Sequence, residues 1–215
     1  MLNIFSTTNC QNIYRISTDF SIKRTDENLI PELTLGRIYY DENFKKTIYK
    51  INFPKSEIWI ENDSCFFITE KNNEYKKLSQ FRISNYSIFS QILNNEIIDF
   101  GLQNAGYSLK KISNQDSFLI SEWSPPIENK LNLDNIILTQ KNKKTNSIIF
   151  YFKDKNVKQK IYFENYLQLE NLKIPTKITK IFESKSGRII EQITFKNIKL
   201  NEINNNSDYN YYCPK

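Results

Sequence analysis

The chain has 215 residues and a formal net charge of +6, from 30 Lys and Arg against 24 Asp and Glu, and it contains no histidine. The missing imidazole excludes Ser-His and Cys-His nucleophile pairs, zincin helices and every His-ligated metal site. Ala105 and Val157 are the only residues of their kinds. The core therefore has to be built from Ile, Leu, Phe and Tyr, a composition that favours strands over close-packed helices.

The first third of the chain is predicted to be a meander of antiparallel strands. Apolar residues alternate with polar ones, which is typical of half-buried strands. Turns are expected around Pro31, at Asp41–Asn43 and at Glu61–Ser64, and Pro54 ends a strand because proline cannot donate to a ladder. The predicted strands are Tyr14–Ile22, Leu33–Tyr40, Thr47–Phe53, Ile58–Ile60 and Phe66–Ile68.

One segment, Tyr86–Phe100, is predicted to be a helix. Ser84 or Asn85 precedes it as an N-cap, and Gly101 follows it as a stop. Two interpretations stay open for this element, a plain core helix and a lid over a ligand. Its apolar stripe consists of Phe89, Leu93, Ile97 and Phe100.

Strand patterns resume after this helix and continue to residue 200. The lysine-rich turn at Lys141–Lys144 is interpreted as a solvated hairpin tip rather than a phosphate-binding patch. About ten strands at hairpin spacing with one central helix predict a mainly β fold, a curved antiparallel sheet covered by one or a few helices, in a single domain over residues 1–215. The later predicted strands are Tyr107–Ile112, Phe118–Trp123, Asn135–Gln140, Ile148–Phe152, Lys158–Phe163, Thr176–Glu183 and Ile189–Leu200.

The sequence offers no motif for catalysis. Its acidic pairs lie in predicted turns, and the nucleophile elbow, the Walker loop and the dinucleotide fingerprint are all missing. We therefore expect no enzyme activity, no metal and no cofactor. Cys10, Cys65 and Cys213 lack zinc-site spacing, and either a Cys10–Cys213 disulfide in an oxidising compartment or three unpaired thiols fits them.

Several strands are apolar at both odd and even positions, as in the consecutive run Ile148–Phe152. Such a strand needs cover on both faces. The second cover is a partner, a bound lipid or the rest of a closed barrel, unless loops simply close a two-layer core. The candidate residues for an apolar ligand cavity are Tyr49, Ile51, Phe53, Phe89, Leu93 and Phe150.

The order of these elements resembles the LolA-like family, the periplasmic carriers of outer-membrane lipoproteins, over nearly the whole chain. The resemblance implies an open half-barrel with helices over its mouth and a function without covalent chemistry. The stretches that carry it are Asp19–Ile22, Gly36–Tyr40, the strand ending at Pro54, the hairpin around Asn62–Ser64, the closing run Gly187–Glu202 and the tail Tyr209–Pro214.

Two features depart from the family pattern. The amphipathic N-terminal helix is reduced to at most Met1–Gln11, and the arginine that helps to latch the lid in many carriers is not matched, Lys50 being the nearest cation. A LolA-like shell without this latch can serve as a lipid-binding or accessory protein instead of a shuttling carrier.

The leading hypothesis is a non-catalytic periplasmic carrier, with its leader removed, that binds acyl chains or a lipidated protein. The alternative is an accessory or plug subunit of an outer-membrane secretion or assembly complex, with Tyr209, Tyr211 and Tyr212 at an interface or in a final strand. A cytoplasmic nucleic-acid binder rests on net charge alone, and no nucleic-acid partner is expected. No stretch approaches the ~18 apolar residues of a membrane helix.

Overall fold

The computed structural model describes residues 13–62, 66–69, 75–78, 88–94, 96–127, 132–155, 157–202 and 206–211. In these ranges the chain forms two short helices, α1 (Ile88–Leu93) and α2 (Asn206–Tyr209), and thirteen strands. The strands are β1 (Arg15–Thr25), β2 (Pro31–Asp41), β3 (Lys46–Phe53), β4 (Glu57–Glu61), β5 (Phe66–Thr69), β6 (Tyr75–Leu78), β7 (Ser108–Gln115), β8 (Phe118–Ser124), β9 (Leu133–Lys141), β10 (Lys144–Phe152), β11 (Lys158–Leu169), β12 (Leu172–Ser184) and β13 (Gly187–Leu200).

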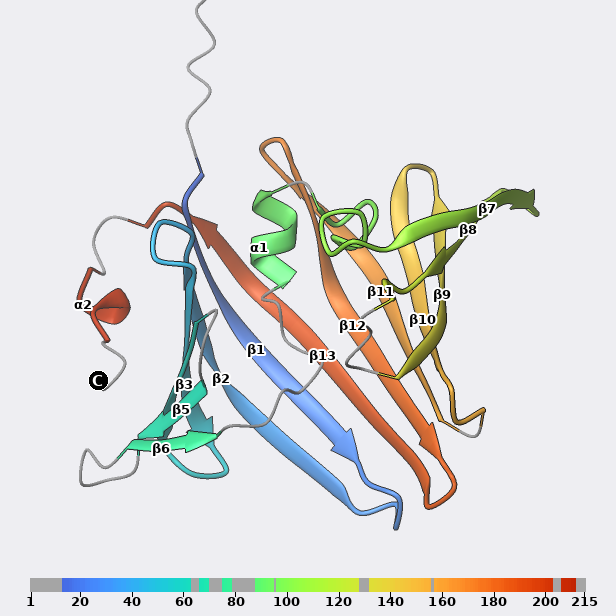
Figure 1. The fold of residues 1–215 in the computed structure, drawn as a ribbon. Coiled ribbons are helices and arrows are strands. Elements are labelled where there is room, and N and C mark those ends of the chain that lie inside the picture. Colours follow the sequence, from blue (N-terminus) through green and yellow to red (C-terminus); the bar gives the residue numbers. More distant parts are fainter. Residues whose placement is uncertain are drawn as a thin grey trace, which may run out of the picture.

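The described strands form one curved sheet in the order β6-β5-β4-β3-β2-β1-β13-β12-β11-β10-β9-β8-β7, with antiparallel neighbours (Figure 1). The chain starts in the middle of the sheet at β1 and steps outward to β6. It then re-enters at the opposite edge with β7 and steps back until β13 pairs with β1. The connection from β6 to β7 must pass from one edge of the sheet to the other, and it carries α1 across the concave face. The prediction of a mainly β, curved antiparallel sheet with helical cover is confirmed.

Hairpin turns in this glycine-poor chain depend on residues with positive φ other than glycine. The β7–β8 turn has Asp116 at φ 46° and Ser117 at 69°, and the β9–β10 turn has Asn142 at 52° and Lys143 at 59°. Two-residue turns with both central residues at positive φ match the right-handed twist of the flanking strands. The lysine-rich segment therefore is a hairpin tip, as predicted.

Gly36 allows β2 and β3 to approach each other beneath an aromatic ring. A Cβ atom at this position would lie 2.2 Å from the backbone oxygen of Lys50 and 2.9 Å from Cε1 of Phe20. The β2–β3 register also shifts here, so that Ile51 lies opposite Gly36 while Phe53 lies opposite Leu35. Because side chains alternate between the faces of a strand, this β-bulge separates Phe53 from Ile51.

The predicted helix over Tyr86–Phe100 is longer than the observed one. Within the described residues α1 ends at Leu93, and the carbonyl of Gln91 accepts both the Glu96 N–H (2.7 Å) and the Ile97 N–H (3.2 Å), bonds wider than the α-helical spacing. The following carbonyls turn toward β9 and β10: that of Ile97 accepts the Thr145 hydroxyl, and that of Ile98 accepts Nε2 of Gln140. The helix therefore ends at Leu93, before its sequence pattern does, and the carbonyls of the turn that follows bond to the sheet.

One observed strand was not predicted, and some predicted features fall on residues that the structure does not describe. The short strand β6, Tyr75–Leu78, was not predicted, because its central Lys76-Lys77 pair carries no apolar alternation. The proposed N-cap, the three cysteines, Tyr212 and the segment Met1–Gln11 lie outside the described residues.

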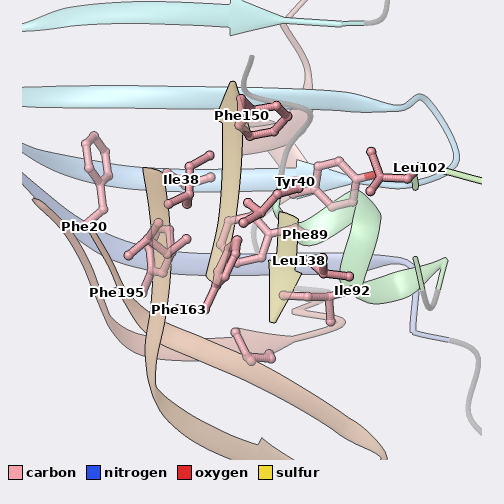
Figure 2. Close-up of a cluster of buried hydrophobic side chains, with 14 of the residues drawn as sticks. Phe20, Ile38, Tyr40, Phe89, Ile92, Leu102, Leu138, Phe150, Phe163 and Phe195 are labelled. Carbon is pink, nitrogen blue, oxygen red and sulfur yellow. The ribbon is translucent and has the colours of Figure 1, made fainter. Parts of the chain in front are cut away.

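Two groups of buried apolar side chains lie on the two faces of the sheet. The larger group fills the concave face under α1, and Figure 2 shows Phe20, Ile38, Phe89, Phe163 and Phe195 among its members. The smaller group lies on the convex face, where α2 places Tyr209 on Tyr39 and Ile48. These two groups are called the concave cluster and the convex cluster below.

Candidate functional site

A cavity of about 270 Å³ lies within the concave cluster, between α1 and the central strands. This volume is just below the ~300–1,000 Å³ of typical ligand pockets. The strands that line it include β1, β2, β11, β12 and β13, so the cavity spans the junction between the first and last strands of the chain. Because α1 crosses over this junction, the connectivity of the sheet determines where the cavity is covered.

The wall of the cavity is built from rows of side chains that face each other across neighbouring strands. Ile22, Ile193, Ile178 and Phe163 are register partners on β1, β13, β12 and β11, and all four line the cavity. Direct partners in an antiparallel sheet point to the same face, so this apolar row presents four hydrophobic side chains side by side. Phe20 and Phe195 form the next pair toward α1.

Two residues further along β1, β13 and β12, these strands and β2 carry a charged row. Glu32, Arg24, Glu191 and Lys180 are register partners on β2, β1, β13 and β12, and their charges alternate in sign. Arg24 lies 3.1 Å from Glu32, and Lys180 lies 3.1 Å from Glu191. The side chains of Arg24 and Glu32 are 41% and 59% exposed, so this end of the cavity reaches solvent at the β1–β2 turn.

The cavity therefore has a polar, solvent-exposed end and an apolar end under the helix. From Phe20 to Arg24 the chain advances four residues, or about 13 Å at the ~3.3 Å per residue of a strand. A row that pairs each charge with its neighbour carries no net charge. It can contact a polar group of a ligand without favouring an anion over a cation.

Tyr49, a lining residue, is hydrogen-bonded to the buried carboxyl of Glu61, which does not itself line the cavity. The Tyr49 hydroxyl donates a hydrogen bond of 2.9 Å to Oε2 of Glu61. Burial raises the pKa of Glu61 to about 7, although the hydrogen bond from Tyr49 and the positive charge of Lys180 oppose this shift. Burial, and then the nearby Glu61 carboxylate, raise the pKa of the Tyr49 hydroxyl, which stays protonated at neutral pH.

The helical end of the cavity is lined by Ile88, Phe89 and Gln91 of α1 and by Phe100. The ring of Phe89 lies 5.2 Å from that of Phe195 and 6.2 Å from that of Tyr40, measured between centroids. These contacts fix α1 over the sheet by apolar packing. Gln91 is the polar side chain among these four.

The six predicted cavity residues are not brought together in one place. Tyr49 and Phe89 line the cavity, whereas Ile51 is buried in the concave cluster beside it. Phe150 also lies in that cluster, 6.3 Å from the ring of Phe100, and Leu93 packs against the cluster from α1. Whether any of these residues contacts a ligand stays a prediction.

Phe53 is placed away from the other candidates. The β-bulge puts it opposite Leu35, and it is 46% exposed, so it does not share a face with Tyr49 and Ile51. The alternation of apolar residues in Thr47–Phe53 suggested one continuous face. A bulge is not visible in that alternation, because the inserted residue belongs to the pairing of two strands.

Lys50, the cation nearest to the unmatched latch arginine, lies on the convex side. Its Nζ atom is 2.6 Å from Oδ1 of Asp208 in α2, and it pairs in register with Arg37 on β2. It is therefore directed away from the cavity and toward the C-terminal segment. Lys50 cannot contact α1 across the mouth of this half-barrel.

Sequence reasoning missed the charged row and Gln91. The four charged residues lie between positions 24 and 191, and only the sheet register aligns them. A local signal was present, since Arg24 and Lys180 each continue the alternate positions of an apolar face, after Ile22 and Ile178. A charge at an apolar position near a strand end indicates that the buried face stops there.

Within the ranges that the structure describes, no three His, Cys, Asp or Glu side chains gather as metal ligands would. In the same residues, neither helix has the length and apolar character needed to span a membrane.

No protein-family model matches the sequence, and no curated protein matches it. Solved structures do. A LolA superfamily protein from Nitrosomonas europaea aligns over 88% of this chain and 87% of its own, with TM-score 0.61 and 15% identity. The chain has the LolA-like fold.

Two other solved structures share the LolA-like arrangement. A DUF1329 family protein from Desulfovibrio piger aligns over 89% of this chain and 87% of its own, with TM-score 0.63 and 11% identity. A domain described as an outer membrane lipoprotein-sorting protein, from Vibrio parahaemolyticus, aligns over 92% and 89%, with TM-score 0.65 and 10% identity. At such identities the likeness concerns the fold, and the LolA-like shell leaves the ligand to be argued from the residues of this chain.

Proposed function

We propose that this protein is a non-catalytic periplasmic binding protein that holds an acyl chain, free or attached to a lipidated protein, in the cavity under α1. The proposal treats residues 1–215 as one LolA-like domain. The observation that carries it is the apolar row Ile22, Ile193, Ile178 and Phe163, which lines a cavity ended by charged side chains. A ligand with a long apolar chain fits this row.

The energy of such a complex comes mainly from burial of the chain. Each buried methylene contributes about 0.8 kcal/mol, so eight of them contribute roughly 6 kcal/mol before the cost of association. The apolar row needs no charged anchor to supply this. The charged row then keeps one end of the cavity in contact with water.

Similarity to a lipoprotein-sorting domain supports the periplasmic part of the proposal. Fractionation of the native cell tests it: the protein should be released with the periplasmic proteins, and recovery with the cytosol would contradict it. Extraction of the purified native protein with organic solvent, followed by mass spectrometry, should recover acyl-chain compounds. Protein recovered free of any such compound would argue against the carrier function.

The cavity itself is tested by a pair of neighbouring substitutions on β13. Ile193→Glu places a carboxylate in the apolar row, whereas Gln192→Glu places the same group on the opposite face of the strand, where Gln192 pairs with Lys23. Uptake of the fluorescent probe 1-N-phenylnaphthylamine should fall at least tenfold for Ile193→Glu and stay unchanged for Gln192→Glu. Equal uptake by the two variants, both folded by circular dichroism, would exclude this cavity as the acyl site.

The alternative, an accessory subunit of an outer-membrane complex, is favoured by exposed apolar side chains near the β7 edge. Leu109 and Ile112 of β7 and Leu119 of β8 are exposed, and Ile127 is fully so. Edge strands with exposed apolar residues are pairing sites for other chains. Gentle detergent extraction and affinity isolation distinguish the two functions, since a stable complex with outer-membrane proteins favours the subunit and a free monomer loaded with lipid favours the carrier.

A further inference from the structure

Gln91 carries an unpaired hydrogen-bond acceptor at the helical end of the cavity. The residue is 5% exposed and lines the cavity, and its Oε1 atom has no hydrogen-bond partner among the described residues. The backbone carbonyl of Gln91, in contrast, accepts two hydrogen bonds from the turn after α1. Buried polar atoms are nearly always paired, so this side-chain oxygen requires a partner that the described protein does not supply.

The tyrosine, tryptophan, arginine and lysine donors among the lining residues already bind other protein groups. The Tyr49 hydroxyl donates to Glu61, and Nε1 of Trp59 donates to Glu57 at 3.0 Å. Arg24 and Lys180 are held in the ion pairs of the charged row. The other α1 side chains that line the cavity, Ile88 and Phe89, have no donor to offer.

We propose that the ligand of this cavity carries a hydrogen-bond donor, an amide N–H or a hydroxyl next to its apolar chain, which Gln91 Oε1 accepts. This inference rests on the proposed acyl-binding function and adds the chemical class of the ligand. A plain ester or hydrocarbon leaves the oxygen unpaired, and an ionised carboxylate or phosphate offers it only further acceptors. A site that hydrogen-bonds a ligand N–H or O–H discriminates strongly against an analogue that lacks it.

The test compares pairs of ligands in which a methyl group replaces the hydrogen of the donor. N-methyldodecanamide has one amide N–H that N,N-dimethyldodecanamide lacks, and 1-dodecanol has a hydroxyl that methyl dodecyl ether lacks. Each competes with 1-N-phenylnaphthylamine for the full-length protein. We expect the donor-bearing member of at least one pair to bind about three- to tenfold more tightly, the range of one net hydrogen bond. The pair with the larger ratio identifies the donor as amide or hydroxyl.

Variants then assign the effect to the side chain. Gln91→Met keeps the size of the side chain but removes the acceptor, so the ratio should fall to about one while the dimethyl amide binds at least as well as before. Gln103→Met, an exposed glutamine on the segment after α1, is the matched control and should keep the wild-type ratio.

The outcomes separate this inference from the proposed function. If every ligand displaces the probe but both wild-type ratios are near one, the role of Gln91 is overturned while acyl binding stands. A ratio that survives in Gln91→Met also overturns it. If the wild-type protein takes up neither probe nor ligand, the proposed function itself fails. The wild-type ratios decide the point even if Gln91→Met does not fold.

Discussion

The two faces of the sheet are covered by different kinds of contact. On the convex face the C-terminal segment is held by charges: Nζ of Lys46 donates to the carbonyls of Tyr209 and Tyr211 at 2.8 Å, and Lys50 pairs with Asp208 at 2.6 Å. The guanidinium of Arg15 lies 4.4 Å from the centre of the Tyr209 ring. These directional contacts fix one position of the cover.

On the concave face α1 is held mainly by apolar packing. Phe89 and Ile92 are buried against the sheet, and the cavity remains beside them. Among the described residues, the hydrogen bonds from this segment to the sheet are in the turn that follows, at the carbonyls of Ile97 and Ile98. Apolar contacts are non-directional, so a cover held in this way can adjust to a guest more easily than one held by ion pairs. The cover of the concave face, on the cavity side, is therefore the more adaptable one, and the cover of the convex face is held in one position.

The largest effect is expected at Phe89, the main anchor of α1. Phe89→Ala removes a ring that is 1% exposed and contacts Phe195 and Tyr40, so the free energy of unfolding should fall by about 3–5 kcal/mol. Urea unfolding followed by tryptophan fluorescence measures it. A loss below about 1 kcal/mol would mean that α1 contributes little to the concave cluster. Apolar packing would then not be what holds α1 on the concave face.

The pH dependence of stability tests the buried carboxyl of Glu61, the partner of Tyr49. The pKa of Glu61 is raised from 4.5 to about 7, so between these values the native state binds more protons than the unfolded state. The free energy of unfolding should therefore fall as the pH rises from about 4.5 to 7, by roughly 3 kcal/mol at most, and this contribution should be constant outside that window.

Glu61→Gln should flatten this part of the stability profile. Glu170→Gln, in the exposed turn between β11 and β12, is the control and should keep the slope. Unfolding in urea at a series of pH values measures both. An unchanged slope in Glu61→Gln would show that another group titrates.

A smaller effect is expected where the convex cover is tied down. Lys50→Met removes the ion pair with Asp208, in which the two side chains are 27% and 24% exposed. The free energy of unfolding should therefore fall by about 0.5–1 kcal/mol. Uptake of 1-N-phenylnaphthylamine should not change, because Lys50 is directed away from the cavity. Reduced uptake would show that the convex cover and the cavity are coupled, so that the two faces do not act independently.

The smallest effect is expected from Tyr209→Phe. The Tyr209 hydroxyl is buried without a hydrogen-bond partner among the described residues, while its ring packs on Tyr39. Removing an unpaired buried hydroxyl and keeping the ring should leave the stability within about 0.5 kcal/mol of wild type or raise it slightly. Thermal unfolding measures this. A clear loss would reveal a partner of the hydroxyl and a tighter convex cover.

Much of the fold could be predicted because strand signals are local. Alternation in Tyr14–Ile22 identified β1, and the runs on either side of Lys141–Lys144 identified the β9–β10 hairpin. The helix was located correctly but overextended, because the turn after Leu93 keeps the apolar spacing while its carbonyls at Ile97 and Ile98 bond to Thr145 and Gln140 of the sheet. These donors lie more than forty residues away along the chain, so no local pattern shows that pairing.

The candidate site was predicted less well. Tyr49 and Phe89 line the cavity, but Phe53 was displaced by a bulge, and Gln91 was overlooked. Gln91 lies off the predicted apolar stripe, where a polar residue is ordinarily solvated, and the sequence holds no sign that it is buried without a partner. Its environment follows only from where α1 rests on the sheet.

The sequence by itself determined the period and the ends of most strands, the glycine-poor turns and the exclusion of histidine chemistry, because each depends on residues close together in the chain. The tertiary structure decided that α1 covers the concave face of the sheet and that α2 covers the convex face. It aligned Glu32, Arg24, Glu191 and Lys180 into one row and directed Lys50 to the convex side. Register between β1 and β13 joins residues more than 160 positions apart, and the packing of the whole sheet, rather than any local preference, sets that register.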